Sequence, residues 1–68
     1  MDDVTYLVAG MSCDHCKASV TEELSRVEGV ALVDVDLDAK LVRVRGTALD
    51  DAALVAAIDE AGYDAVRA

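Results

Sequence analysis

The feature that most constrains the fold is a hydrophobic period that switches between two residues and about 3.6 residues along the chain. The first segment alternates as a half-buried strand does, with apolar side chains at Val4, Tyr6 and Val8. The next segment has helical spacing, with apolar side chains at Val20, Leu24 and Val27. A strand period follows, and the second half of the chain repeats the succession. The pattern therefore predicts two strand–helix–strand halves in tandem.

The predicted elements have the order βαββαβ. We expect strands at about 4–9, 33–37, 42–45 and 64–67, and helices at about 15–27 and 51–61. The second helix is expected to face the core with Leu54, Ala57, Ile58 and Ala61. Gly29 and Gly62 follow the two helices at the position where a left-handed residue commonly ends a helix. Such a chain is expected to form an α+β, ferredoxin-like sandwich, in which two helices cover one face of a four-stranded antiparallel sheet.

A four-residue turn at 38–41 is expected to join the second and third strands. It would place Leu37 opposite Val42 and Val35 opposite Val44 on the buried face. On the solvent face, it would pair Asp36 with Arg43 and Asp34 with Arg45. Such opposite-charge pairs contribute about 0.2–1 kcal/mol each, and a slip by one residue would bury the charges.

Length and composition limit the class of protein. We expect the 68 residues to form a single domain, 1–68, that buries only about 60% of its unfolded surface and leaves no room for an enclosed substrate cavity. No segment approaches the roughly 20 apolar residues of a membrane span. The acidic start resembles no signal peptide, which favours the cytoplasm, where thiols stay reduced. A net charge of −8 argues against nucleic acid and anionic membranes as partners.

The only two cysteines, Cys13 and Cys16, form a Cys-x-x-Cys between the first strand and the first helix. Two thiols at this spacing can close a disulfide, bind a metal or act as nucleophiles. The positive end of the helix dipole lowers thiol pKa values, and residues i and i+3 lie side by side. Two thiolates with little else suit a soft ion such as Cu(I). Structural zinc needs four ligands, and His15 points away from its neighbours, although a zinc site shared between two chains stays open.

The segment Gly10-Met11-Ser12-Cys13-x-x-Cys16, with Gly62-Tyr63 after the second helix, resembles the heavy-metal-associated domain family. Within it, the chain is similar to free-standing bacterial copper chaperones of the CopZ type over nearly its whole length. The resemblance implies that Cys13 and Cys16 bind Cu(I) as a near-linear bis-thiolate. It also implies that Met11 is not a ligand but packs into the core and braces the loop.

The resemblance implies secondary roles for other residues near the cysteines. Zinc-handling members of the family usually carry an acidic residue where Ser12 stands, which favours Cu(I), with Ag(I) as a mimic, over Zn(II). Tyr63 would approach the site from the loop after the second helix, with edge packing as the alternative. His15 would tune thiol acidity or supply a ligand when two molecules share copper, or it is an exposed histidine without a role.

Two charged residues beside the cysteines have ordinary explanations as well. Lys17 would add positive charge near the thiolates, although an exposed helix lysine is the commoner case. Asp14 adds negative charge, or it caps the helix.

These features together predict a cytoplasmic copper chaperone, not an enzyme. The resemblance implies delivery of copper to a copper-transporting P-type ATPase, with a copper-responsive repressor as a further partner. The apo protein would be monomeric, with a copper-bridged dimer as an option. An acidic surface predicts basic docking patches on the partners.

Two alternatives stay open at this stage. One is a metal-binding domain of a heavy-metal ATPase. Met1 and the end of the chain just after the last strand favour a free-standing protein over this alternative. The other is a thiol–disulfide oxidoreductase. The short length, the lack of proline for a substrate loop, the lack of an aromatic residue before Cys13 and the predicted strand order argue against it.

Overall fold

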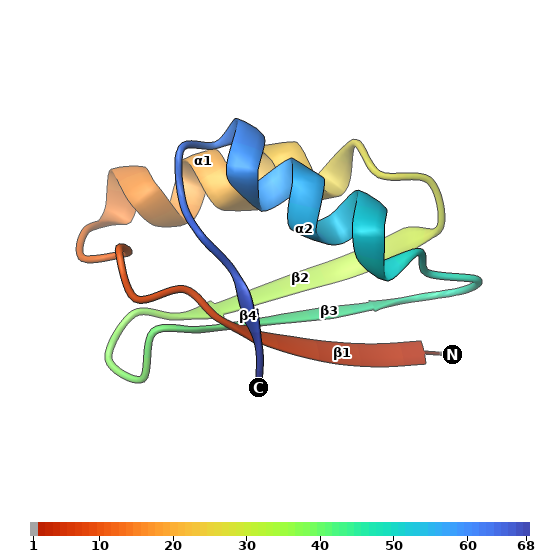
Figure 1. The fold of residues 1–68 in the computed structure, drawn as a ribbon, viewed down its shortest axis with the longest axis horizontal. Helices are drawn as coiled ribbons and strands as arrows, with labels where there is room; N and C mark the ends of the chain where they lie inside the picture. The colour runs from red at the N-terminus through yellow and green to blue at the C-terminus, as the bar shows by residue number, and fades with distance from the viewer. Residues whose placement is uncertain (1) are drawn as a thin grey trace.

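The computed structural model describes residues 2–68 (Figure 1). Its elements are β1 (Asp2–Leu7), α1 (Asp14–Ser25), β2 (Val30–Asp36), β3 (Leu41–Gly46), α2 (Asp51–Glu60) and β4 (Val66–Arg67). This is the predicted βαββαβ order, with a shorter last strand than expected. Met1, on which part of the free-standing prediction rests, lies outside the described residues.

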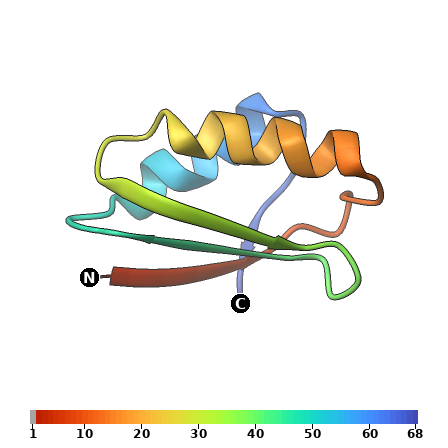
Figure 2. The ribbon, with the colours of Figure 1, turned by 180° about the vertical axis from the view of Figure 1, so that it is seen from behind.

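The sheet interleaves the two halves of the chain. Its strand order is β2-β3-β1-β4, and all neighbouring strands are antiparallel. β3 therefore lies between the two strands of the first half, and β1 lies between the two strands of the second. Neither half can form this sheet alone. Figures 1 and 2 show both helices on one face of the sheet, so the predicted ferredoxin-like fold is confirmed.

The core lies between the sheet and the helices. Its fully buried residues include Tyr6, Val8, Met11, Val20, Leu24, Val42, Val44, Leu54 and Ile58. The chain has no Phe or Trp, so Tyr6 supplies the largest buried side chain. The predicted inward residues of both helices lie in this core, with Val27 and Ala61 half-buried at its edge.

The buried ring of Tyr6 carries a polar group that joins three elements. Its hydroxyl donates a hydrogen bond to Asp51 Oδ1 at the start of α2. Arg67 Nη1 of β4 lies 3.3 Å from the same oxygen. Burial, followed by the bond to Asp51, raises the pKa of Tyr6 above its usual value, so this hydroxyl stays a donor. β1, α2 and β4 are thereby tied together near the sheet centre.

The predicted register of the β2–β3 hairpin is wrong by two residues. Val35 lies opposite Val42, and Asp34 lies opposite Arg43. The turn occupies 37–40 because the Asp36 carboxylate accepts hydrogen bonds from the N–H groups of Asp38 and Ala39, at 3.0 and 3.1 Å. A shift by two keeps the apolar faces matched, since side chains alternate with period two. The buried pattern alone could therefore not distinguish the two registers.

The expected ion pairs across this hairpin are also wrong. The Nε atoms of Arg43 and Arg45 lie 3.9 and 3.7 Å from the carboxylate of Asp3, on β1. β3 lies between β2 and β1, so its arginines can pair with acidic residues of either strand. The sequence does not show which strand lies on the other side of β3. The outer face of the sheet is exposed at these positions, as predicted.

The two helices end differently. Gly62, with φ +94°, follows α2, and the N–H of Tyr63 donates to the carbonyl of Ile58 (3.2 Å), as in a Schellman cap. α1 ends earlier than predicted, so Gly29, with φ +91°, lies in the turn before β2 and not directly after the helix. Within residues 2–68, neither helix has the length and apolar character needed to cross a bilayer.

Candidate metal centre

The loop after β1 is anchored by two buried side chains. Val8 and Met11 are fully buried, whereas Gly10 between them is exposed. The Met11 N–H donates to the Val8 carbonyl at 3.2 Å and closes a tight turn. The prediction that Met11 packs into the core is confirmed. The chain leaves this anchor at Ser12, so the cysteines emerge at the surface.

Cys13 is the N-cap residue of α1. Its backbone is extended, with φ −148° and ψ 169°, and its carbonyl accepts the N–H of Lys17 at 3.2 Å. The alternative that Asp14 caps the helix is wrong, because Asp14 is the first helical residue. A cysteine stands where Ser, Thr, Asn or Asp usually caps the first-turn N–H groups, and its side chain makes no capping bond. This helix end therefore favours negative charge on nearby atoms.

The two cysteine sulfurs lie side by side. Their Sγ atoms are 3.3 Å apart, and both residues are free thiols. Cys13 is exposed, while Cys16, one turn into the helix, is half-buried. The i, i+3 spacing thus brings both sulfurs within reach of a single ion, as the sequence predicts.

The surroundings of the site make the Cys16 thiol more acidic than an ordinary cysteine. Its pKa is lowered from 9.0 to about 7, first by hydrogen bonding from the backbone at Ser12 and then by the Tyr63 hydroxyl and by Cys13. Hydrogen bonds to the thiolate stabilise the charged form. The thiolate of Cys16, which is the form that binds metals, is therefore favoured near neutral pH relative to an ordinary cysteine. The same bond raises the pKa of Tyr63, which donates as a neutral hydroxyl.

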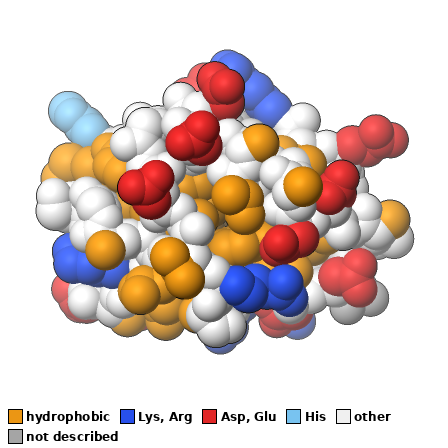
Figure 3. All heavy atoms as spheres, viewed as in Figure 1, with side chains coloured by type: hydrophobic (Ala, Val, Ile, Leu, Met, Phe, Trp, Pro, Cys, Tyr) orange, Lys and Arg blue, Asp and Glu red, His pale blue; other side chains and the backbone are white. Residues whose placement is uncertain are grey.

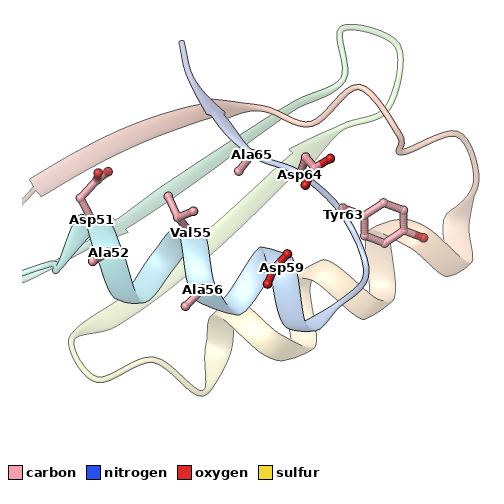
Figure 4. Close-up of a pocket in the computed structure, with 8 residues that line it drawn as sticks. All are labelled: Asp51, Ala52, Val55, Ala56, Asp59, Tyr63, Asp64 and Ala65. Atoms are coloured by element: carbon pink, nitrogen blue, oxygen red, sulfur yellow. The ribbon is translucent and has the colours of Figure 1, made fainter.

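Tyr63 reaches the site from the opposite end of the chain. The Schellman cap of α2 turns the backbone there, and Figure 4 shows the ring projecting from the loop after α2 toward the start of α1. A Cβ at Gly10 would lie only 3.2 Å from Cδ1 of this ring. Gly10 therefore lets the ring pack against the loop. The sequence motif contains this glycine but does not reveal its neighbour.

The other predicted residues do not converge on the sulfurs. Ser12 acts through its backbone, while its side chain is exposed. His15 is exposed, and its side chain takes part in none of the side-chain hydrogen bonds found among residues 2–68. No third His, Cys, Asp or Glu side chain in the described part of the chain joins the two cysteines. Residues 2–68 therefore offer no four-ligand structural zinc site.

One contact near the site was not foreseen. Lys40, in the β2–β3 turn, donates from Nζ to the backbone carbonyl of Met11 at 2.7 Å. The two residues are 29 positions apart in the sequence. No local pattern could have indicated this contact, since it depends on the hairpin and the loop meeting in the fold.

Comparisons with known proteins bear on this site. The family described as the heavy-metal-associated domain matches residues 5–64. The copper chaperone CopZ of Staphylococcus saprophyticus is 42% identical over 65 residues, covering 88% of this chain and 91% of that protein. A solved CopZ metallochaperone superposes with a TM-score of 0.89 at 34% identity, over 96% of this chain and 100% of that one. A copper-binding domain from HMA7, a P-type ATPase, gives a TM-score of 0.91 at 27% identity, over 100% and 95%.

These relatives support a copper chaperone, and the prediction that the chain is not an enzyme agrees with a family of metal-binding carriers. The family match begins within β1 and extends past α2 to the residue after Tyr63. Because that span includes the loop with both cysteines and nearly all of the interleaved sheet and helices, this chain belongs to the heavy-metal-associated domain family.

Proposed function

We propose that this chain is a copper chaperone that binds one Cu(I) ion between Cys13 and Cys16 and passes it on by thiolate exchange. The observation that carries the proposal is the pair of free thiols 3.3 Å apart at the start of α1. Two soft sulfur ligands select soft ions. The lowered pKa of Cys16 supplies a thiolate near neutral pH.

Cu(I) fits this site better than zinc. Taking the zinc–thiolate distance of about 2.3 Å as a guide, linear coordination would hold the sulfurs about 4.6 Å apart. The exposed side chain of Cys13 can make this small adjustment by rotation. Zn(II) would need further ligands, and Ser12 offers no carboxylate. Ag(I), which shares the preference for two thiolates, should bind as a mimic of Cu(I).

Transfer proceeds by exchange of sulfur ligands. The exposed side of Cys13 lets a thiolate of the partner form a third bond to the copper ion. One bond to this chain then breaks, a second thiolate of the partner binds the ion, and the remaining bond to this chain breaks in turn. Both released thiolates of this chain take up a proton or await the next ion. Copper remains Cu(I) throughout, so the step needs no oxidant or reductant.

The receiving partner is a protein of metal transport, and we assign this role to the cysteine-containing domain of a copper-transporting P-type ATPase. The helical layer that carries the site is acidic: its helices hold Asp14, Glu22, Glu23, Asp51, Asp59 and Glu60. Red side chains are scattered over this layer in Figure 3. A shallow groove beside Tyr63 is rimmed by Asp51, Asp59 and Asp64 (Figure 4). A basic face on the partner would complement it.

Several finer points belong to the same proposal. The working unit is the single domain 1–68, acting in the cytoplasm. A copper-responsive repressor is a second receiver. His15 is exposed beside the cysteines. We assign it the role of a ligand to copper shared between two molecules, which would give a copper-bridged dimer of loaded chains while the apo protein stays monomeric.

An anaerobic titration tests the proposal. The reduced protein is titrated with Cu(I) against a chromophoric chelator, with Zn(II) in parallel. We expect one Cu(I) per chain and far weaker zinc binding. Changing a residue that only supports a metal ligand typically lowers metal affinity about 10- to 100-fold. Cys13→Ser and Cys16→Ser each remove a proposed ligand and should lower the Cu(I) affinity by more than this. His15→Ala is the matched control and should keep one-to-one binding.

The same variants define the outcome against the proposal. Below pH 7, where Cys16 is protonated in both the folded and the unfolded chain, both serine variants should keep the unfolding temperature of the apo protein, since neither thiol belongs to the fully buried core. Weak Cu(I) binding by the wild type would refute the copper site. Rapid exchange of a Cys13–Cys16 disulfide with other thiols, without tight Cu(I) binding, would favour the oxidoreductase instead.

A further inference from the structure

We propose that Lys40 is a positioning residue that holds the cysteine loop in its metal-binding conformation from the β2–β3 turn. The inference rests on the proposed function, because it assigns Lys40 a role at that site. It concerns a residue that touches neither cysteine and that lies 27 and 24 positions away from them in the chain.

Lys40 contacts both ends of the tight turn that precedes the cysteines. Its backbone carbonyl accepts the N–H of Val8 at 2.8 Å, and its Nζ donates to the carbonyl of Met11 at 2.7 Å. The turn itself is closed by the bond from the Met11 N–H to the Val8 carbonyl, at 3.2 Å. Three hydrogen bonds thus fix the segment between Val8 and Met11. In Figures 1 and 2, the β2–β3 turn lies at the same end of the sheet as this loop.

The backbone of Lys40 indicates that this placement has a cost. Its φ is +57°, in the left-handed region that favours Gly and Asn over other residues. A residue held in this region points to a constraint elsewhere in the structure. Here glycine would relieve the backbone but could not supply the ammonium that binds the Met11 carbonyl. The side chain accounts for a lysine at a position where a turn alone would favour a smaller residue.

The ammonium of Lys40 serves the loop and not a surface ion pair. The chain has 14 acidic residues, yet none of the salt bridges found among residues 2–68 includes Lys40. The residue is half-buried, so its bond to the Met11 carbonyl is shielded from water. A hydrogen bond from a charged donor is stronger than a neutral one.

Met11 is two residues before Cys13, so the orientation of its carbonyl affects the position of the Cys13 backbone. Met11 fixes the inner side of the loop by burial, and Lys40 fixes its backbone from the outside. Ser12, whose backbone stabilises the Cys16 thiolate, lies between the held carbonyl and Cys13. Loss of the lysine contact should therefore let the two sulfurs sample a wider range of separations. Copper binding would then have to bring the sulfurs back to the binding distance, which lowers the affinity.

Three variants test this role. Lys40→Met keeps the aliphatic stem but removes the donor, and Lys40→Arg keeps both donor and charge. Lys17→Met removes an exposed positive charge four residues after Cys13 and leaves the Met11 carbonyl untouched. For each apo protein, hydrogen exchange of the Met11 amide is compared with that of the core of α2. Cu(I) affinity is measured by chelator competition at a temperature where the protein is folded.

We expect Lys40→Met to speed exchange of the Met11 amide and to weaken Cu(I) binding about 3- to 10-fold, part of the value of a charged hydrogen bond. The amides of α2 should be unchanged, and Lys40→Arg should restore most of both effects. Unchanged exchange and affinity in Lys40→Met would overturn the proposal. So would uniformly faster exchange, or an equal loss of affinity in Lys17→Met, which would indicate a general charge effect.

The two proposals fail separately. If the wild type does not bind Cu(I), the chaperone function is wrong, while the exchange of the Met11 amide still reports whether Lys40 holds the loop. If the wild type binds Cu(I) tightly but Lys40→Met matches it in both measurements, only the role of Lys40 is wrong.

Discussion

Removing the hydroxyl of Tyr63 should make Cys16 less acidic. The structure lowers the Cys16 pKa from 9.0 to about 7, and the Tyr63 hydroxyl is the second-largest of the groups that lower it, after the backbone at Ser12. Tyr63→Phe deletes only this donor and keeps the ring that packs at Gly10. Because the other hydrogen bonds remain, the midpoint of the Cys16 titration should rise from about 7 but stay below 9.0.

The titration should be followed at Cys16 itself, by the ¹³Cβ chemical shift of the reduced apo protein from pH 5 to 10. Tyr6→Phe provides a matched control, because it removes the other tyrosine hydroxyl, which binds Asp51 and not the cysteines. We expect the midpoint of Tyr6→Phe to equal that of the wild type. An unchanged midpoint in Tyr63→Phe, or an equal rise in both variants, would refute the assignment of Tyr63 as a donor to the thiolate.

Two further predictions concern stability. Tyr6→Phe should lower the free energy of unfolding by about 1 kcal/mol, because it removes the partly buried hydrogen bond that joins β1 to α2. Urea denaturation checks this, and an unchanged midpoint would show that the bond contributes nothing. The reduced apo protein should also become more stable as the pH rises from about 7 to 9, because Cys16 ionises near 7 when folded and near 9.0 when unfolded. This contribution is lost as the pH falls through 7. Denaturation of wild type and Cys16→Ser across this range should diverge, and parallel curves would contradict the lowered pKa.

Much of the fold follows from local patterns. The hydrophobic period predicts all six elements because strands and helices of a two-layer domain each bury one face. Element ends are less certain: α1 stops at Ser25, two residues before the predicted end. The hairpin register is decided by the turn, where the Asp36 carboxylate caps the N–H groups of Asp38 and Ala39. The period of two allows either register, so only the folded turn distinguishes them.

The position of the cysteine pair is likewise a local property. Residues i and i+3 at a helix start lie together whatever the rest of the fold does, so the sequence alone places Cys13 beside Cys16. It also predicts that the two thiolates are ligands for a soft metal ion. The burial of Met11 also follows from its place beside a core strand. The spacing of residues along one segment thus determines the chemistry that the site can carry.

The surroundings of the pair depend on tertiary structure. Tyr63 and Lys40 reach the site from two turns that the interleaved sheet and its helices bring to one end of the molecule. The acidity of Cys16, the packing of a ring against Gly10 and the hydrogen bonds around Met11 all require those turns to be in place. Such contacts span long stretches of sequence and leave no period or spacing behind. The sequence by itself therefore determines which two sulfur atoms lie together for the proposed metal, and only the fold decides how firmly these sulfurs are held and how readily they ionise.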